Sequence, residues 1–233
     1  METEPEPSGP SAVSLAECGG LLFPGQPYSA CVLKVGYCCP QPDGTAKADG
    51  TITLLTGPQN ILVDTGGPWD RDFLLRSLQE RGLSAADIHV VVGTHGHSDH
   101  IGNLGLFPTR CWRWALTCAG GHVRGQPVSA GGSVLIVPTP GHSGQDVSVQ
   151  VTGLAGGTTL LVAGDLFESC KDEATWRELS LNPAQQQLNR QRALQAADVI
   201  IPGHGLPFRV CRETIETNGA GPIFPVSLPK NKL

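Results

Sequence analysis

The stretch THGHSDH at residues 94–100 gathers three histidines and an aspartate in one short segment. It follows Ile88–Gly93, a β-branched run that predicts a buried strand. Side chains two positions apart in an extended chain share a face, so His95 and His97 can point at one metal ion. Asp99 and His100 come where the chain turns, and they can point at a neighbouring position. Imidazole and carboxylate suit zinc and its first-row neighbours, so the stretch predicts a metal-binding loop.

Three further residues of ligand type lie downstream, each beside a glycine and directly after a strand-like run. They are His142, Asp165 and His204, which follow the runs Ser133–Pro138, Thr158–Ala163 and Asp198–Ile201. Strand ends at one edge of a sheet are where layered α/β folds build sites. A surface loop that carries histidines by chance is the alternative, and the repeated pattern argues against it.

The order of these segments resembles that of the metallo-β-lactamase superfamily. The matching parts are ILVDTG at 61–66, HGHSDH at 95–100, and then His142, Asp165 and His204. The resemblance covers roughly Ala30 to Val210, and several parts in a fixed order make it specific. It implies an α/β fold with a single domain, a four-layer αββα sandwich that carries its site at one edge of the paired sheets.

The resemblance also implies two zinc ions per chain and a role for each residue. The ligands of the first ion would be His95, His97 and His142. Those of the second would be Asp99, His100 and His204. Asp165 would bridge the ions, and Asp64 would support the ligand loop without binding a metal. Asp99, His100 and Asp165 are the expected catalytic residues, because such two-metal sites use a metal-bound hydroxide as the nucleophile.

A closer similarity narrows the expected activity. ILVDTGGPW at 61–69, VVGTHGHSDHIGNLGLF at 91–107 and PGHGLPFRV at 202–210 resemble a short vertebrate member of the superfamily. That similarity implies a zinc-dependent endoribonuclease that cleaves single-stranded RNA at histone pre-mRNA 3′ ends. Three alternatives stay open: a glyoxalase-II-like thioester or lactam hydrolase, a mononuclear iron dioxygenase that uses His95, His142 and Asp165, and a metal-free binding module.

The composition of the 233 residues is typical of one loop-rich globular domain. We expect this domain over residues 21–212, flanked by disordered tails at 1–20 and 213–233. The net charge of −5 argues against a strongly basic nucleic-acid-binding protein. Single-stranded RNA is the expected partner, no membrane association is expected, and a homodimer stays open.

The eight cysteines include no C-x-x-C pair, and Met1–Ser11 lacks the apolar core of a secretory signal. We therefore expect reduced thiols that serve as small apolar packing residues, in a protein of the cytosol and, by diffusion, of the nucleus.

Elements around the expected site follow from periodicity. Strands are predicted at Tyr28–Cys38 and Thr51–Thr56, with a turn region at Pro40–Gly50 between them. A helix is predicted at Asp70–Arg81, capped by Asp70, and another is expected to start in Ile101–Phe107. A second long helix is predicted at Pro183–Ala197.

The stretch 109–128 is the hardest to interpret, because it mixes arginine, tryptophan and cysteine and contains no acidic residue. It is either a basic, aromatic face for RNA or a buried connection.

Overall fold

Side chains alternate between two buried faces along the central strands, and this alternation builds the layers of the fold. The computed structural model describes residues 13–108, 112–113, 126–128, 131–172 and 174–212. In β7 (Ile61–Val63), Ile61 and Val63 lie in the core between two sheets, whereas Leu62 packs with the cluster around helix α1 (Arg71–Gln79). In β13 (Leu160–Gly164), Val162 joins the central core, and Leu161 packs on the side of helix α3 (Pro183–Ala196).

Within the described residues, the first sheet has six strands with mixed pairing. Their order is β2 (Leu22–Phe23), β3 (Ser29–Lys34), β6 (Ile52–Thr56), β7, β8 (Val90–Val92) and β9 (Trp112–Arg113). The parallel pairs β7–β8 and β8–β9 lie at its end, and the strand ends after β7 and β8 reach the same edge of the sheet. This edge carries Asp64 and the histidine-rich stretch.

The second sheet has seven strands among the described residues. Their order is β1 (Val13–Glu17), β15 (Phe208–Arg212), β14 (Val199–Pro202), β13, β12 (Val147–Val151), β11 (Val134–Pro138) and β10 (Gln126–Pro127). The pair β13–β14 is parallel, so the residues after both strands come together at one edge. Asp165 and His204 occupy these positions.

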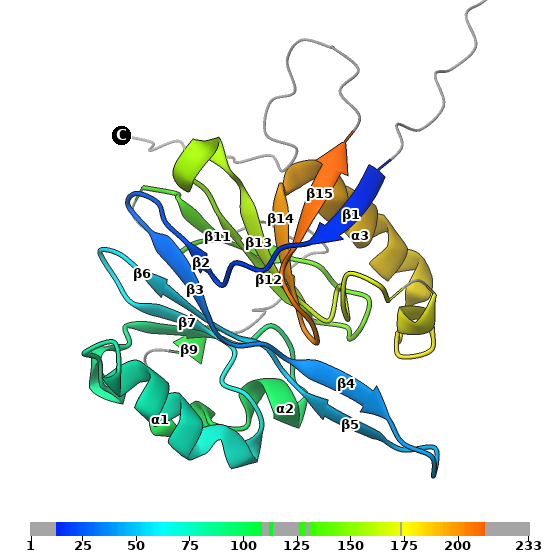
Figure 1. The fold of residues 1–233 in the computed structure, drawn as a ribbon, viewed down its shortest axis with the longest axis horizontal. Coiled ribbons are helices and arrows are strands. Elements are labelled where there is room, and N and C mark those ends of the chain that lie inside the picture. The colour runs from blue at the N-terminus through cyan, green and yellow to red at the C-terminus, as the bar shows by residue number, and fades with distance from the viewer. Residues whose placement is uncertain (1–12, 109–111, 114–125, 129–130, 173, 213–233) are drawn as a thin grey trace, which may run out of the picture.

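The two sheets pack face to face, with α1 on the outer side of the first and α3 on the outer side of the second (Figure 1). This arrangement confirms the predicted four-layer αββα sandwich. The other helical segments among the described residues are short: α2 (Ser98–Ile101) and the 3-10 helices at Pro68–Asp70, Ala85–Asp87, Leu104–Leu106, Ala155–Gly157 and Thr175–Arg177. In the described part of the chain, no helix has the length and apolar character that a membrane crossing requires.

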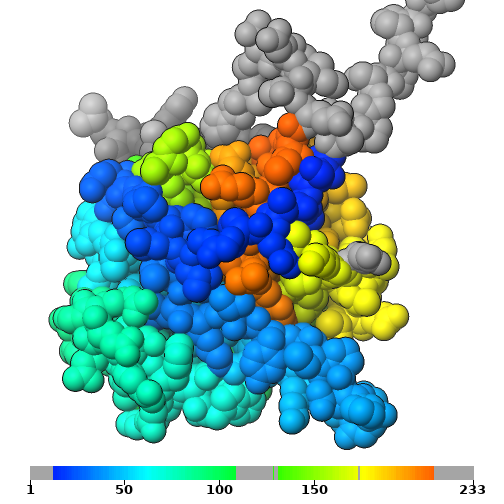
Figure 2. Space-filling model, in the orientation of Figure 1, coloured from blue at the N-terminus to red at the C-terminus, as the bar shows by residue number. Residues whose placement is uncertain are grey.

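Several local predictions are wrong. The run Tyr28–Cys38 is two strands, β3 and β4 (Tyr37–Pro40), because Gly36 packs against the backbone of Gly203 and leaves no room for a side chain. The expected turn region Pro40–Gly50 contains β5 (Ala46–Asp49), which pairs with β4 in a hairpin that stands out from the surface (Figures 1 and 2).

The N-terminal end of the chain also differs from the prediction. Val13–Glu17 lies in the expected N-terminal tail, yet it forms β1 and pairs along its whole length with β15. Residues 1–12 and the predicted tail at 213–233 lie outside the described residues. Most of 109–128 does too, so neither interpretation of that stretch is tested.

The predicted cap and helix start also need correction. The Asp70 side chain makes no cap bond to α1; it accepts hydrogen bonds from Gly67 N and Lys34. The helix expected to start in Ile101–Phe107 is not there: α2 already ends at Ile101, and a 3-10 turn follows at Leu104–Leu106. Asp99 and His100 are therefore helical. Cysteines 38, 39 and 211 are exposed, which contradicts a packing role for them.

Candidate metal centre

Asp64 organises the ligand loop of the first sheet. It ends β7 with a φ of 59°, a left-handed conformation that is uncommon outside glycine. Its Oδ1 accepts the Thr94 N–H at 2.7 Å, and its Oδ2 lies 2.7 Å from Thr94 Oγ1 and 2.8 Å from Nδ1 of His100. A bond to Nδ1 fixes the ring of His100 and leaves its Nε2 directed into the site. Asp64 therefore has a geometry that suits the supporting role that the resemblance implies.

Helix α3 organises the loops of the second sheet. The Gln186 amide donates to the carbonyl oxygen of Asp165 at 2.9 Å, and the Asn189 amide donates to that of Pro140 at 2.7 Å. Gly141 packs so closely on Gln186 that a Cβ there would lie 2.4 Å from the Cβ of Gln186. One helix face thus fixes both the Asp165 loop and the His142 loop, which explains why α3 buries polar side chains.

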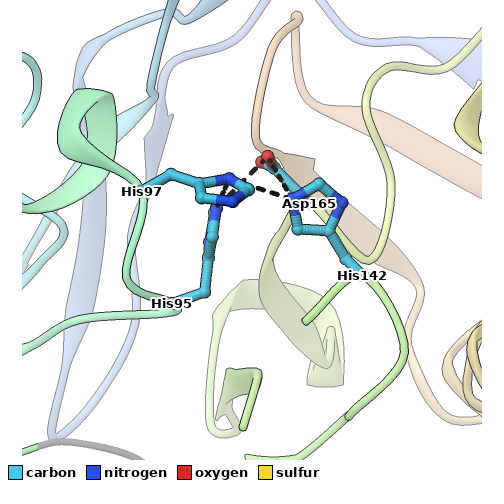
Figure 3. A group of neighbouring side chains, drawn as sticks. All are labelled: His95, His97, His142 and Asp165. Atoms are coloured by element: carbon cyan, nitrogen blue, oxygen red, sulfur yellow. Dashed lines mark hydrogen bonds and ion pairs between the residues drawn. The ribbon is translucent and has the colours of Figure 1, made fainter. Parts of the chain in front are cut away.

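Four of the predicted residues converge on one point (Figure 3). Nδ1 of His97 lies 2.9 Å from Nε2 of His95 and 3.1 Å from Nε2 of His142. Oδ2 of Asp165 lies 3.4 Å from Nε2 of both His95 and His142. We call His95, His97, His142 and Asp165 the first ligand group.

Asp99, His100 and His204 form the second ligand group, on the other side of Asp165. Oδ2 of Asp99 lies 3.9 Å from Nε2 of His100 and 3.7 Å from Nε2 of His204. Asp165 faces this group too, with Oδ1 3.1 Å from His100 Nε2 and Oδ2 3.3 Å from His204 Nε2. The structure therefore brings all seven predicted residues together, with one carboxylate between the two groups.

These atoms fit a metal ion in two respects. Nitrogen and oxygen ligands about 2.0–2.2 Å from a tetrahedral zinc stand roughly 3.3–3.6 Å apart. The distances from Asp165 Oδ2 to His95 and His142, 3.4 Å, fall in this range, and those from His97, 2.9 and 3.1 Å, are somewhat shorter. Asp165 Oδ1 and His100 Nε2 are buried 3.1 Å from each other, and neither has a further hydrogen-bond partner. Buried polar atoms normally have a partner, and a cation between the two atoms would supply one.

Comparison with known proteins identifies the family. Residues 48–112 match the model of the metallo-β-lactamase superfamily. The chain is 45% identical to human metallo-β-lactamase domain-containing protein 1, over 88% of this chain and 92% of the relative. The Xenopus laevis protein of the same name is 48% identical, over 82% and 85%. The chain belongs to the metallo-β-lactamase superfamily.

Solved structures of metallo-β-lactamase folds agree with this assignment. A protein from Thermotoga maritima, described as a putative metallo-β-lactamase, superimposes with a TM-score of 0.60 at 20% identity, covering 78% of this chain and 99% of that one. An N-acyl homoserine lactone hydrolase with product at its catalytic metal centre gives 0.55 at 16% identity, covering 78% and 94%. At such identities the likeness shows the fold alone. The chain is thus a member of a metallo-hydrolase superfamily with side chains that could hold a metal.

Burial and charge shift the proton affinities in this metallo-β-lactamase site. Burial lowers the pKa of His95 well below its ordinary value. Burial also opposes charging of His204, but the hydrogen bond and charge of Asp165 raise the pKa of His204 to about 9. For His100, the Asp165 and Asp64 carboxylates overcome burial and raise the pKa well above its usual range. A metal needs deprotonated ligands, so protons and metal compete at these histidines.

Glu168 is a site residue that the sequence analysis missed. It is buried, with Oε2 3.8 Å from Nε2 of His204 and Oε1 3.7 Å from Nδ1 of His142. Burial, and then the charge of Asp165, raise the pKa of Glu168 to about 8. Its position three residues after Asp165 was the available signal, but a glutamate in a loop has no distinctive spacing.

Proposed function

We propose that the chain is a dinuclear zinc hydrolase that cleaves single-stranded RNA. The observation that carries the two-metal part is the position of Asp165, whose buried carboxylate faces both ligand groups. Its Oδ2 lies near His95, His142 and His204, and its Oδ1 lies near His100. A carboxylate that faces members of both groups in this way suits a bridging ligand.

The residues of the chain would act by binding and orientation. Zinc bound here would lower the pKa of a coordinated water to near 7 and polarise the scissile bond. His95, His142 and Asp165 are buried, whereas His97 is exposed and Asp99 is partly so. Substrate would therefore approach from the side of His97 and Asp99, while the buried ligands hold the geometry.

The RNA part of the proposal rests on what the resemblance of the stretches 61–69, 91–107 and 202–210 implies, and two exposed aromatic side chains add support. Trp69 is 64% exposed and Tyr37 is 43% exposed. Trp69 donates a hydrogen bond to the Asp49 side chain, and Tyr37 is the strand partner of Asp49 in the β4–β5 hairpin. The carbonyl oxygen of Asp49 is 3.1 Å from His204 Nδ1. Aromatic rings beside a site can stack bases in any sequence. The net charge of −5 argues against a broad phosphate-binding surface, so recognition would be short and local.

A thioester or lactam hydrolase is the second candidate, and an apolar side chain favours it. Leu181 is 80% exposed, and its N–H donates to the carbonyl oxygen of His142 at 3.1 Å. An exposed leucine fixed to a ligand loop could contact an acyl chain. The iron dioxygenase is less favoured, because His97 adds a fourth ligand to the set of His95, His142 and Asp165, where a facial triad leaves positions open. Convergence of all seven residues argues against the metal-free binding module.

The test begins with metal content. Purified protein should carry two zinc ions per chain by mass spectrometry, and a chelator should remove both the metal and the activity. Cleavage rates are then compared for single-stranded RNA, the matching duplex, and acyl thioester and lactam substrates. One iron per chain would overturn the proposal in favour of the dioxygenase. Two zinc ions with hydrolysis of thioester or lactam alone would support the second candidate.

A further inference from the structure

Asp49 belongs to neither ligand group, yet it holds one of their members. It is the last residue of β5, and its carbonyl oxygen lies 3.1 Å from Nδ1 of His204. A hydrogen bond there requires the proton on Nδ1 and leaves Nε2 free for a metal. That Nε2 lies 3.3 Å from Asp165 and 3.7 Å from Asp99. The carbonyl thus sets both the tautomer and the direction of the His204 ring.

The side chain of Asp49 is itself fixed by three donors from the first half of the molecule. Trp69 Nε1 donates to its Oδ2 at 2.8 Å, and Gly67 N donates to its Oδ1 at 3.2 Å. Lys34 Nζ forms an ion pair with Oδ2 and is also 2.5 Å from Asp70. Asp49 and Asp70 are buried, so a lost donor would leave unsatisfied charge. These contacts tie the end of β5 to β3 and to the start of α1.

The two residues after Asp49 contact the remaining ligand loops. Thr51 donates to the carbonyl oxygen of Gly203 through its N–H at 2.8 Å and its hydroxyl at 2.9 Å. Gly50 N donates to the carbonyl oxygen of Asp99 at 3.2 Å. A Cβ on Gly50 would lie 3.0 Å from the His100 ring. The segment from Asp49 to Thr51 therefore touches the loops of all three members of the second ligand group.

We propose that Asp49 is a positioning residue for the second ligand group: its anchored side chain holds the main chain that orients His204. The inference rests on the proposed two-metal function. The physical basis is that three contacts fix the Asp49 side chain, and the carbonyl group of the same residue bonds His204. The first ligand group receives no contact from Asp49 among the described hydrogen bonds, so its metal affinity should not depend on this residue.

The test compares Asp49→Ala with Asp43→Ala, which removes an exposed aspartate from the tip of the same hairpin. Metal stoichiometry is measured by native mass spectrometry, and the two affinities by titration against a chromophoric chelator. Losing an outer partner of a metal ligand typically weakens binding by about 10- to 100-fold. Asp49→Ala should show this loss for one ion only, with a matching change in the cobalt-substituted spectrum. Asp43→Ala should match the unmodified chain.

A milder variant covers the case in which Asp49→Ala does not fold. Trp69→Phe keeps an exposed aromatic ring and removes only the Nε1 donor, so the fold should persist. It should weaken the same single ion several-fold, and Asp49→Asn should recover part of the loss of Asp49→Ala. If Asp49→Ala binds both metal ions as tightly as the unmodified chain does, the inference is wrong, while the proposed function still stands. If Asp49→Ala is unfolded, the same result for Trp69→Phe leads to the same conclusion. An unmodified chain that binds a single ion would overturn the proposed function and the inference with it.

Discussion

The two sheets supply their share of the site in different ways. The first sheet contributes His95, His97, Asp99 and His100 from one loop after β8. The second contributes His142, Asp165 and His204 from three separate connections, which follow β11, β13 and β14. One loop can be ordered by one neighbouring carboxylate, that of Asp64. Three loops need a common support, and α3 provides it for two of them.

The supports also differ in chemistry. Asp64 uses a charged carboxylate within the first half, and its partners are Thr94 and His100. In the second half, neutral amides of Gln186 and Asn189 bond main-chain carbonyl oxygens. The buried Asp146 carboxylate also accepts from the N–H groups on either side of His142, those of Gly141 and Ser143. Hydrogen bonds to charged groups are stronger than neutral ones, so loss of the Asp64 carboxylate should matter more for the ligands than loss of one amide of α3.

The largest effect is expected where the halves meet. Asp165→Ala should abolish hydrolysis and lower the content of both metals, because the Asp165 carboxylate faces both ligand groups. The domain should remain folded, since the apolar core between the sheets is untouched. Metal analysis, activity and circular dichroism check this, with the exposed Asp72→Ala as a control. Retained activity, or loss of one metal alone, would show that the ligands from the two sheets hold their metals independently of Asp165.

A smaller effect is expected from the first half's support. Asp64→Asn keeps the shape and tolerates the positive φ, but one oxygen becomes a donor that cannot accept from Thr94 or His100. Metal affinity should fall by about 10- to 100-fold, as for other outer partners. Chelator titration measures it. An unchanged affinity would mean that packing alone orders the ligand loop.

The support in the second half should matter mainly for stability. Gln186→Leu leaves the buried carbonyl oxygen of Asp165 without its donor, which should lower the free energy of unfolding by about 1–3 kcal/mol. Urea denaturation of the metal-free protein gives the value. Gln191→Leu, on the exposed side of the same helix, should change it little. Equal destabilisation by both variants would contradict a specific role for Gln186.

The smallest effect concerns the substrate. A 2′-deoxy nucleotide at the cleavage position should leave the rate largely intact, because water and not the 2′-hydroxyl is the proposed nucleophile. Within the described residues, His89 is the one histidine outside the ligand groups, and it bonds Asn60 instead. Products should carry a 5′-phosphate and a 3′-hydroxyl, which end-group labelling detects. A 2′,3′-cyclic phosphate on the products would rule out water as the nucleophile.

Local signals in the sequence sufficed for much of the fold. β-branched and apolar runs predicted β8, β11, β13 and β14, and apolar spacing predicted α1, because burial of one face imposes a period that survives in the sequence. Pro183, at the first helical position, marked the start of α3. The hairpin β4–β5 and strand β1 escaped prediction. Both are short and largely exposed, so no buried face imposes a pattern on them.

The sequence by itself determined which side chains of ligand type follow strand ends, and the tight spacing from His95 to His100 marked the first half. Their binding of zinc stays a prediction. Only the tertiary structure decided that Asp165 faces both groups, that Glu168 joins them, and that Asp49 meets His204 across 155 positions of sequence. Spacing can specify contacts within a turn or a loop. Contacts between distant segments depend on how two sheets pack, and no short pattern in the chain records that.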